Sequence, residues 1–238
     1  MSQAAPAAIE TQAASTDAPK PSVKLFDRSK HISPSVPHPD FPNGRKECVV
    51  RFPTDKEWCQ RAHRIVQVRK NVGDGVKTEN SGMEDANLEL FNAIRIDKDG
   101  PEFDGAEAMM VLGRIERTEI VDTTRQGVNY AIRIKTFFGS PVIVTHTLKI
   151  PTQKQLMDFT RAAIDIVGRK QTMETRFALE PAGDLWKKVH VSHDGYSPVA
   201  VTAADPEFCD VPVIHKDVAI NELMSRVNSD FEDSDPED

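Results

Sequence analysis

Two stretches of the chain turn from a strand-like run into a helix in the same way, and this repeated corner constrains the fold more than any other feature. Residues 51–58 read Arg-Phe-Pro-Thr-Asp-Lys-Glu-Trp, and residues 149–156 read Lys-Ile-Pro-Thr-Gln-Lys-Gln-Leu. In both, the threonine hydroxyl can accept a hydrogen bond from a first-turn N–H. The Glu or Gln three residues later can return a bond to the threonine N–H, which completes a capping box. The sequence therefore predicts a strand–Pro-Thr–helix unit used twice, whether by duplication or by a shared solution to one corner.

Each predicted helix carries apolar residues at helical spacing, which is typical of a helix that packs on a sheet. In the first helix these residues are Trp58, Ala62, Ile65 and Val66, and in the second they are Leu156, Phe159, Ala163, Ile166 and Val167. Further helices are expected near 84–96, 104–117, 181–189 and 216–227. Residues 71–82 are rich in Gly, Asn and Asp, so we expect a mobile loop there, and 191–212 are expected to form a long irregular connection.

The apolar period changes from helical to two in the middle of the chain. Tyr130, Ile132 and Ile134 alternate with polar residues, and a similar alternation runs through 142–150. The intervening Gly139-Ser140 suits a two-residue hairpin turn, and 119–124 add a third strand. The predicted fold is therefore α+β: a small, mainly antiparallel meander sheet of about four strands with helices packed on one face.

The two ends differ in composition from the rest. Seven of the 16 prolines lie in residues 1–44, which have almost no periodic apolar pattern, so this Pro/Ala-rich arm is expected to be disordered. Six carboxylates in the last nine residues account for all but one of the seven net negative charges, and we expect 229–238 to be a disordered acidic tail. Residues 45–228 are expected to form a single domain, within which the 71–82 loop can separate a first subdomain.

Several classes of protein are disfavoured by what the sequence lacks. No run of 18 apolar residues is present and the N-terminus has no signal-peptide pattern, so we expect no membrane association and a cytoplasmic location. The three cysteines are odd in number and form no Cys-x-x-Cys pair, which indicates free thiols.

The sequence offers three candidate chemical sites, and none carries a specific signature. His190 and His193 resemble half of a metal site but have no partner cluster at zinc-like spacing. Cys59 and His63 lie at i and i+4 on one predicted helix face, which suits proton exchange, but no third group orients them. Gly73-Asp74-Gly75 lacks the remainder of a phosphate-binding loop. We therefore predict no catalytic residue, no metal and no cofactor, and a protein that is not an enzyme.

A local excess of basic residues is the remaining candidate. Residues 45–70 hold eight Lys and Arg against three Asp and Glu. The partner-binding residues that we predict are Arg61, Arg64, Arg69 and Lys70. The near-neutral body argues against general nucleic-acid binding. The favoured hypothesis is therefore a protein-interaction or assembly factor of phage or mobile-element origin. The alternative hypothesis is a nucleic-acid-associated protein that uses the basic helix around Arg61 to Lys70.

Overall fold

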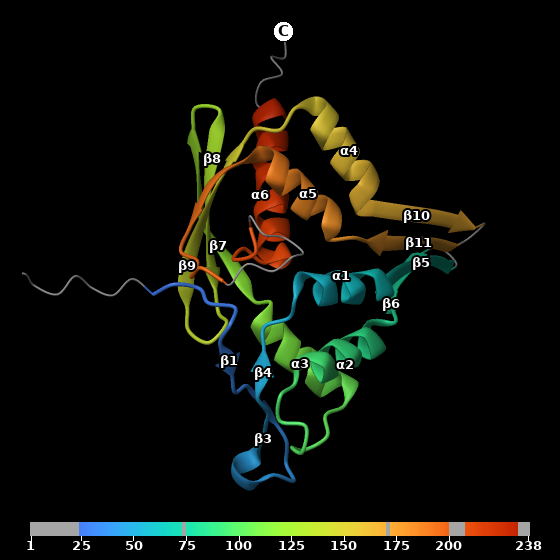
Figure 1. Cartoon of the computed structure of the whole chain (residues 1–238). Helices are drawn as coiled ribbons and strands as arrows, with labels where there is room; N and C mark the ends of the chain where they lie inside the picture. Colours follow the sequence, from blue (N-terminus) through green and yellow to red (C-terminus); the bar gives the residue numbers. More distant parts are fainter. Residues whose placement is uncertain (1–23, 73–74, 170–171, 200–207, 233–238) are drawn as a thin grey trace, which may run out of the picture.

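The computed structural model describes residues 24–72, 75–169, 172–199 and 208–232 (Figure 1). Its main sheet has four antiparallel strands in the order β12-β9-β8-β7. The strands are β7 (Thr118–Gln126), β8 (Asn129–Thr136), β9 (Val142–Lys149) and β12 (His190–Asp194). Helices α4 (Gln153–Ala163), α5 (Glu180–Val189) and α6 (Val213–Glu232) lie on the same side of this sheet in Figure 1. The predicted α+β class, with an antiparallel meander and helices on one face, is confirmed.

A second group of elements lies below the main sheet in Figure 1. Its helices are α1 (Asp55–Arg64), α2 (Met83–Ile94) and α3 (Gly105–Ile115), and a 3-10 turn covers Pro42–Gly44. Two short antiparallel ladders complete it: β1 (His31–Ile32) with β4 (Val50–Arg51), and β2 (Ser35–Pro37) with β3 (Arg45–Glu47). No helix in the described part of the chain is both long and apolar enough to cross a bilayer.

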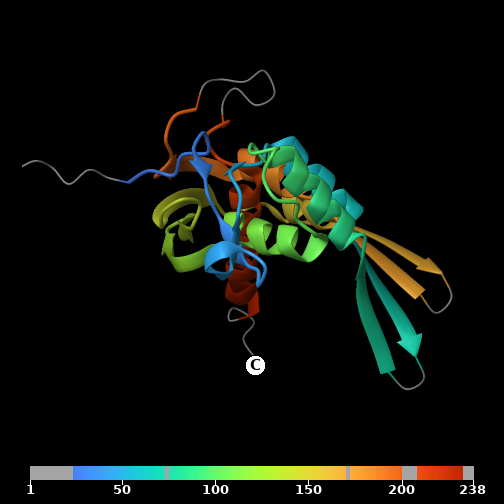
Figure 2. The same cartoon turned by 90° about the horizontal axis from the view of Figure 1, so that it is seen from below.

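The third sheet projects from the body and is made of two hairpins (Figure 2). Its strands are β5 (Val66–Val72), β6 (Gly75–Ser81), β10 (Ile164–Arg169) and β11 (Thr172–Phe177), in the order β10-β11-β5-β6. The two hairpins join where β11 pairs antiparallel with β5, from Arg176 opposite Val66 to Thr172 opposite Lys70. Segments about a hundred residues apart thus form one continuous sheet.

Both predicted helix starts are present. Thr54 accepts from the Glu57 N–H at 3.3 Å, and the Glu57 carboxylate accepts from the Thr54 N–H at 2.8 Å. Thr152 and Gln155 repeat the same two distances. The capping boxes are therefore confirmed at both Pro-Thr corners.

The predicted helical stripes extend too far, because both helices end earlier and continue as strands. Helix α1 stops at Arg64, so Ile65 and Val66 are not helical, and the C-cap Ile65 is extended. Helix α4 stops at Ala163, which places Ile166 and Val167 in β10. These residues are β-branched and restricted at χ1, so they fit a pleated strand better than a helix end.

Two segments expected to be irregular contain strands. The expected mobile loop 71–82 is mostly hairpin, because β6 pairs with β5 from Val72 opposite Gly75 to Val66 opposite Ser81. Its Gly73 and Asp74 lie outside the described residues. The expected connection 191–212 begins as strand β12, which pairs with β9. In both cases pairing with a partner strand overrides a composition that is typical of loops.

The expected disorder of residues 1–44 is wrong for 24–44, while 1–23 lie outside the described residues. Phe26 and Val36 are fully buried in the core, and Phe26 exchanges backbone hydrogen bonds with Gly195 and Ser197 at 2.8 and 2.7 Å. A segment this short needs no core of its own, because two apolar side chains can dock on the core of the body. At the other end α6 extends to Glu232, past the predicted boundary at 228, and 233–238 are not described.

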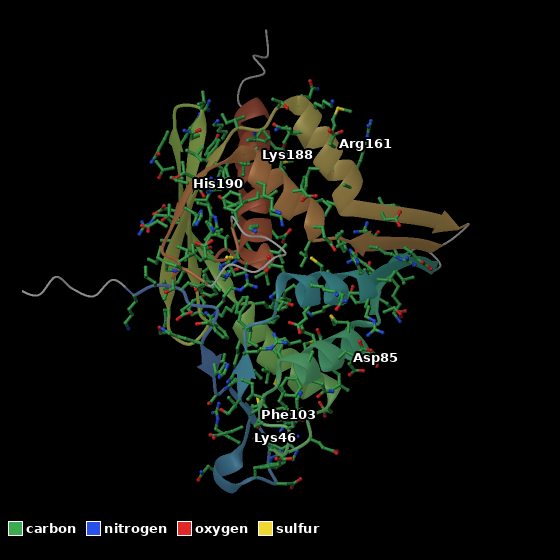
Figure 3. The ribbon with its side chains drawn as sticks, viewed as in Figure 1. Lys46, Asp85, Phe103, Arg161, Lys188 and His190 are labelled. Carbon is green, nitrogen blue, oxygen red and sulfur yellow. The ribbon has the colours of Figure 1, made fainter. Side chains whose placement is uncertain are left out.

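A buried ion pair joins the second group of elements, and its lysine, Lys46, is labelled in Figure 3 close to Phe103. The Lys46 ammonium is 2.6 Å from the Glu107 carboxylate, and each side chain is less than a tenth exposed. The same ammonium lies 4.7 Å from the centre of the Phe103 ring, a cation–π distance. Glu107 also caps α3 by accepting from the Asp104 N–H at 2.9 Å.

The structure extends the sequence echo into a longer repeat. Each unit runs strand, Pro-Thr corner, helix, hairpin and second helix: β4-α1-β5-β6-α2 in the first, and β9-α4-β10-β11-α5 in the second. Each is also closed in the same way. Arg95, just after α2, bridges antiparallel to Val50, and His190, just after α5, pairs antiparallel with Leu148. Val50 and Leu148 both lie three residues before the proline of their corner.

Candidate functional site

The projecting sheet ends in two strands that have a neighbour on one side only, β10 and β6. Along such an edge, alternate N–H and C=O groups point away from the sheet without a ladder partner. Edges of this kind are templates for pairing with another strand. This sheet is therefore the part of the molecule whose geometry most favours contact with another chain.

One face of this sheet carries exposed apolar side chains at the β10 edge. Ile164 pairs across the ladder with Phe177, and Ile166 lies two residues along the same strand, so all three share one face. Their exposed fractions are 37%, 45% and 57%. The β6 edge is polar and exposed instead, with Thr78, Asn80 and a Lys77–Glu79 ion pair of 2.6 Å.

The four predicted partner-binding residues do not form one helix face. Arg61 and Arg64 lie on α1, whereas Arg69 and Lys70 lie on strand β5. The Arg61 guanidinium is 2.8 Å from Glu116 and 2.7 Å from the Asn87 side-chain oxygen, and Arg64 pairs with Glu89. Arg69 is exposed, and the described residues offer it no ion-pair partner. The basic stretch is thus divided between internal ion pairs on α1 and the projecting sheet.

The structure places the candidate Cys59–His63 pair at a cavity of about 370 Å³ between α1 and the helices α5 and α6. It also supplies the third group that sequence reasoning missed: Glu180, whose carboxylate is 3.1 Å from His63 Nε2. Burial and the nearby Glu180 carboxylate raise the pKa of the Cys59 thiol to about 12. This raised pKa disfavours the thiolate form of Cys59, which is the form that acts as a nucleophile.

Two of the seven histidines form a fully buried hydrogen-bonded chain. The Trp186 indole N–H donates to His146 Nδ1 at 3.2 Å, so the His146 proton must lie on Nε2. That nitrogen is 2.9 Å from the Tyr196 hydroxyl, which can in turn donate to His215 Nδ1 at 3.1 Å. With both imidazoles neutral, each of these three hydrogen bonds has one donor and one acceptor. Burial lowers the pKa of His146 well below its ordinary value and that of His215 to about 3.

The predicted loop histidines form a second chain beside the first. His190 Nε2 is 3.0 Å from His193 Nδ1, and His193 Nε2 is 2.9 Å from the Asp210 carboxylate. His190, labelled in Figure 3, also lies against the Trp186 ring with 4.3 Å between ring centres. Burial is the main cause that lowers the His190 pKa, followed by the charge of His193. The contact between His193 and Asp210 connects strand β12 to the segment before α6.

Within the described ranges, no three His, Cys, Asp or Glu side chains are grouped as a metal site would require. The imidazole nitrogens of His193 and His146 are occupied by protein hydrogen bonds, which leaves them without a lone pair for a cation. Comparison with known proteins adds no assignment: no family model, no curated protein and no solved structure matches the chain.

Sequence reasoning missed the projecting sheet, although a local signal for it was present. Val66 and Val68 alternate with Gln67, and Ile164 and Ile166 alternate with Asp165, which is the period of a strand. The sequence Asp-Gly at 74–75 is also a strong hairpin signal. Both alternations follow a helical stripe directly, and their first apolar residues fit the period of that stripe as well.

Proposed function

We propose that this chain is a non-enzymatic assembly protein that docks on other protein chains through the sheet β10-β11-β5-β6. The observation that carries the proposal is a projecting sheet with two open edges and an exposed apolar face at one of them. Contiguous exposed apolar residues on an edge are costly unless a partner covers them. The proposal includes a cytoplasmic location and a phage or mobile-element origin.

The chemistry of the polar clusters favours this role over catalysis. The pKa of the Cys59 thiol is raised, and the buried His146 bonds to Trp186 and Tyr196 inside the core. Buried groups that bond to one another stabilise a fold, and a raised thiol pKa disfavours a cysteine nucleophile.

The test is co-purification after chemical cross-linking in a native host extract. Phe177→Lys should abolish the cross-linked partners, because it places a charge on the exposed face of the sheet. Val128→Lys is the matched control, since Val128 is 71% exposed but lies at the distant β7–β8 turn. Partners retained by Phe177→Lys and lost by Val128→Lys would refute the sheet as the docking surface.

A nucleic-acid role is the second candidate. It is favoured by Arg69, which is the one arginine of residues 45–70 that lies on the projecting sheet. Phosphate contacts release counterions, so such binding must weaken steeply with salt. Fluorescence anisotropy with a labelled duplex and a labelled single strand should detect no binding at physiological salt. Salt-dependent micromolar binding that Arg69→Glu abolishes and Arg61→Glu leaves intact would overturn the assembly proposal.

A further inference from the structure

The internal junction of the projecting sheet joins the two repeat units head to tail. In each unit the hairpin has a first strand, β5 or β10, and a second strand, β6 or β11. The sheet order β10-β11-β5-β6 places the second strand of one unit beside the first strand of the other. This contact, β11 with β5, is antiparallel and covers five residue pairs. It is a heterologous contact, because its two sides come from different positions in the repeat.

The two free edges are the counterparts of the two sides of that junction. By the repeat, β6 corresponds to β11 and β10 corresponds to β5. Strand direction alternates across the whole sheet, so a second copy in the same orientation would offer its β10 antiparallel to β6 of the first. The pairing that the chain already makes once internally is therefore available again between copies.

We propose that copies of this chain associate head to tail, with β6 of one copy pairing antiparallel with β10 of the next. This inference rests on the proposed function, and it names the partner as a second copy of the chain. The pairing extends the four-stranded sheet across molecules and brings the exposed Ile164 and Ile166 beside the β6 strand of a neighbour. A heterologous contact closes into a ring if its rotation permits and otherwise gives an open filament.

The character of the two edges predicts a weak and specific contact. A single added strand buries less surface than a stable interface needs, so each contact should be reversible. The β6 edge carries Lys77, and edge lysines disfavour indiscriminate strand pairing. Two β6 edges would oppose lysine-bearing strands to each other, whereas β10 brings the apolar Ile164 and Ile166 to β6.

The experiment uses outward-facing prolines in the full-length chain. Adjacent residues of an edge strand point their N–H alternately into the sheet and into solvent. One of Thr78→Pro and Glu79→Pro therefore blocks the β6 edge without breaking the hairpin, and one of Asp165→Pro and Ile166→Pro does so for β10. The variant of each pair that keeps the melting temperature of the unmodified chain is carried forward.

Sedimentation velocity over a range of concentrations then gives the answer. The unmodified chain should exceed its monomer mass of 26.5 kDa as concentration rises, and each edge variant alone should stay monomeric. An equimolar mixture of the β6-blocked and β10-blocked variants should form a dimer, because each retains the edge that the other lacks. An unmodified chain that is monomeric throughout, or edge variants that still associate alone, would overturn the inference. Loss of cross-linked partners in Phe177→Lys with a strictly monomeric chain would refute self-association and leave the docking proposal standing.

Discussion

Thr54 and Thr152 are single residues on which the start of a whole helix depends. Each hydroxyl accepts from the N–H three residues later at 3.3 Å. Thr54→Ala and Thr152→Ala should each lower the free energy of unfolding by about 1 kcal/mol in urea titrations. Thr160→Ala is the control, because its hydroxyl bonds to the Leu156 carbonyl inside α4 and alanine is a better helix former. Equal losses at Thr160 and Thr152 would mean that capping is not the cause.

The Lys46–Glu107 pair makes a second prediction at the residue scale. Glu107→Gln keeps an oxygen for the Asp104 N–H but leaves the Lys46 ammonium buried without a counter-charge. The free energy of unfolding should fall by about 3 kcal/mol, because an uncompensated buried charge is costly. The double variant Lys46→Met with Glu107→Gln should recover more than half of that loss in the same urea titration. A double variant as unstable as the single one would show that the loss does not come from the unpaired charge.

At the scale of elements, the packing of α2 against the end of α1 depends on Gly82. Its φ is +75°, and an added Cβ would lie 2.5 Å from the Arg64 carbonyl oxygen. Gly82→Ala should therefore lower the free energy of unfolding by more than the 1–2 kcal/mol typical of the left-handed backbone alone. Gly127→Ala has a φ of +63° but open space around it, so it measures that backbone cost by itself. Equal losses for the two glycines would refute the close approach of α1 and α2.

Replacing a glycine in the middle of a helix should stabilise the chain instead, and Gly113 in α3 tests this. An added Cβ there meets nothing within 4 Å. Gly113→Ala should raise the free energy of unfolding by about 0.5–1 kcal/mol, because alanine loses less backbone entropy on folding. Thermal unfolding of the three glycine variants should rank Gly113→Ala above the unmodified chain and Gly82→Ala lowest. A Gly113→Ala chain less stable than the unmodified one would contradict the open helix face.

The elements also show which parts of the fold the sequence could predict. The helix starts at Thr54 and Thr152 were predictable because a capping box is local, as were strands β8 and β9 because their alternation is long. The ends of α1 and α4 were not, since Ile65 and Ile166 satisfy a helical stripe and a strand period equally well. The pairing of β11 with β5 leaves no local signal, because it is decided by contacts between residues about a hundred positions apart.

At the scale of the whole molecule, one buried cluster of side chains joins the main sheet, the helices α5 and α6 and the N-terminal segment. His146 comes from β9, Trp186 from α5 and His215 from α6, and Tyr196 connects them. Phe26 packs against this cluster, with its ring centre 4.7 Å from that of His215. A proton on His146 Nδ1 would face the Trp186 N–H proton, so that hydrogen bond would be lost. A proton on His215 Nδ1 would likewise face the proton that the Tyr196 hydroxyl donates. The chain of hydrogen bonds is therefore intact only while both histidines are neutral.

This requirement predicts how stability depends on pH. Near pH 5 the unfolded chain protonates both histidines, whose ordinary pKa is 6.5, while the native chain protonates neither. Burial raises the pKa of Asp217 to about 6, so the native chain holds one proton there that the unfolded chain lacks. Across these three groups the unfolded chain binds about one proton more, so they lower the free energy of unfolding by about 1.4 kcal/mol for each unit that the pH is lowered. The lowered pKa values of His190, Glu57 and Asp97 act in the same direction. Asp217→Asn removes the opposing proton and should steepen the slope by about 1.4 kcal/mol per pH unit, whereas His215→Gln should make it shallower by about the same amount. Urea titrations at pH 4.5, 5.0 and 5.5 measure the three slopes, and three equal slopes would exclude the buried histidines as the acid-sensitive element of the fold.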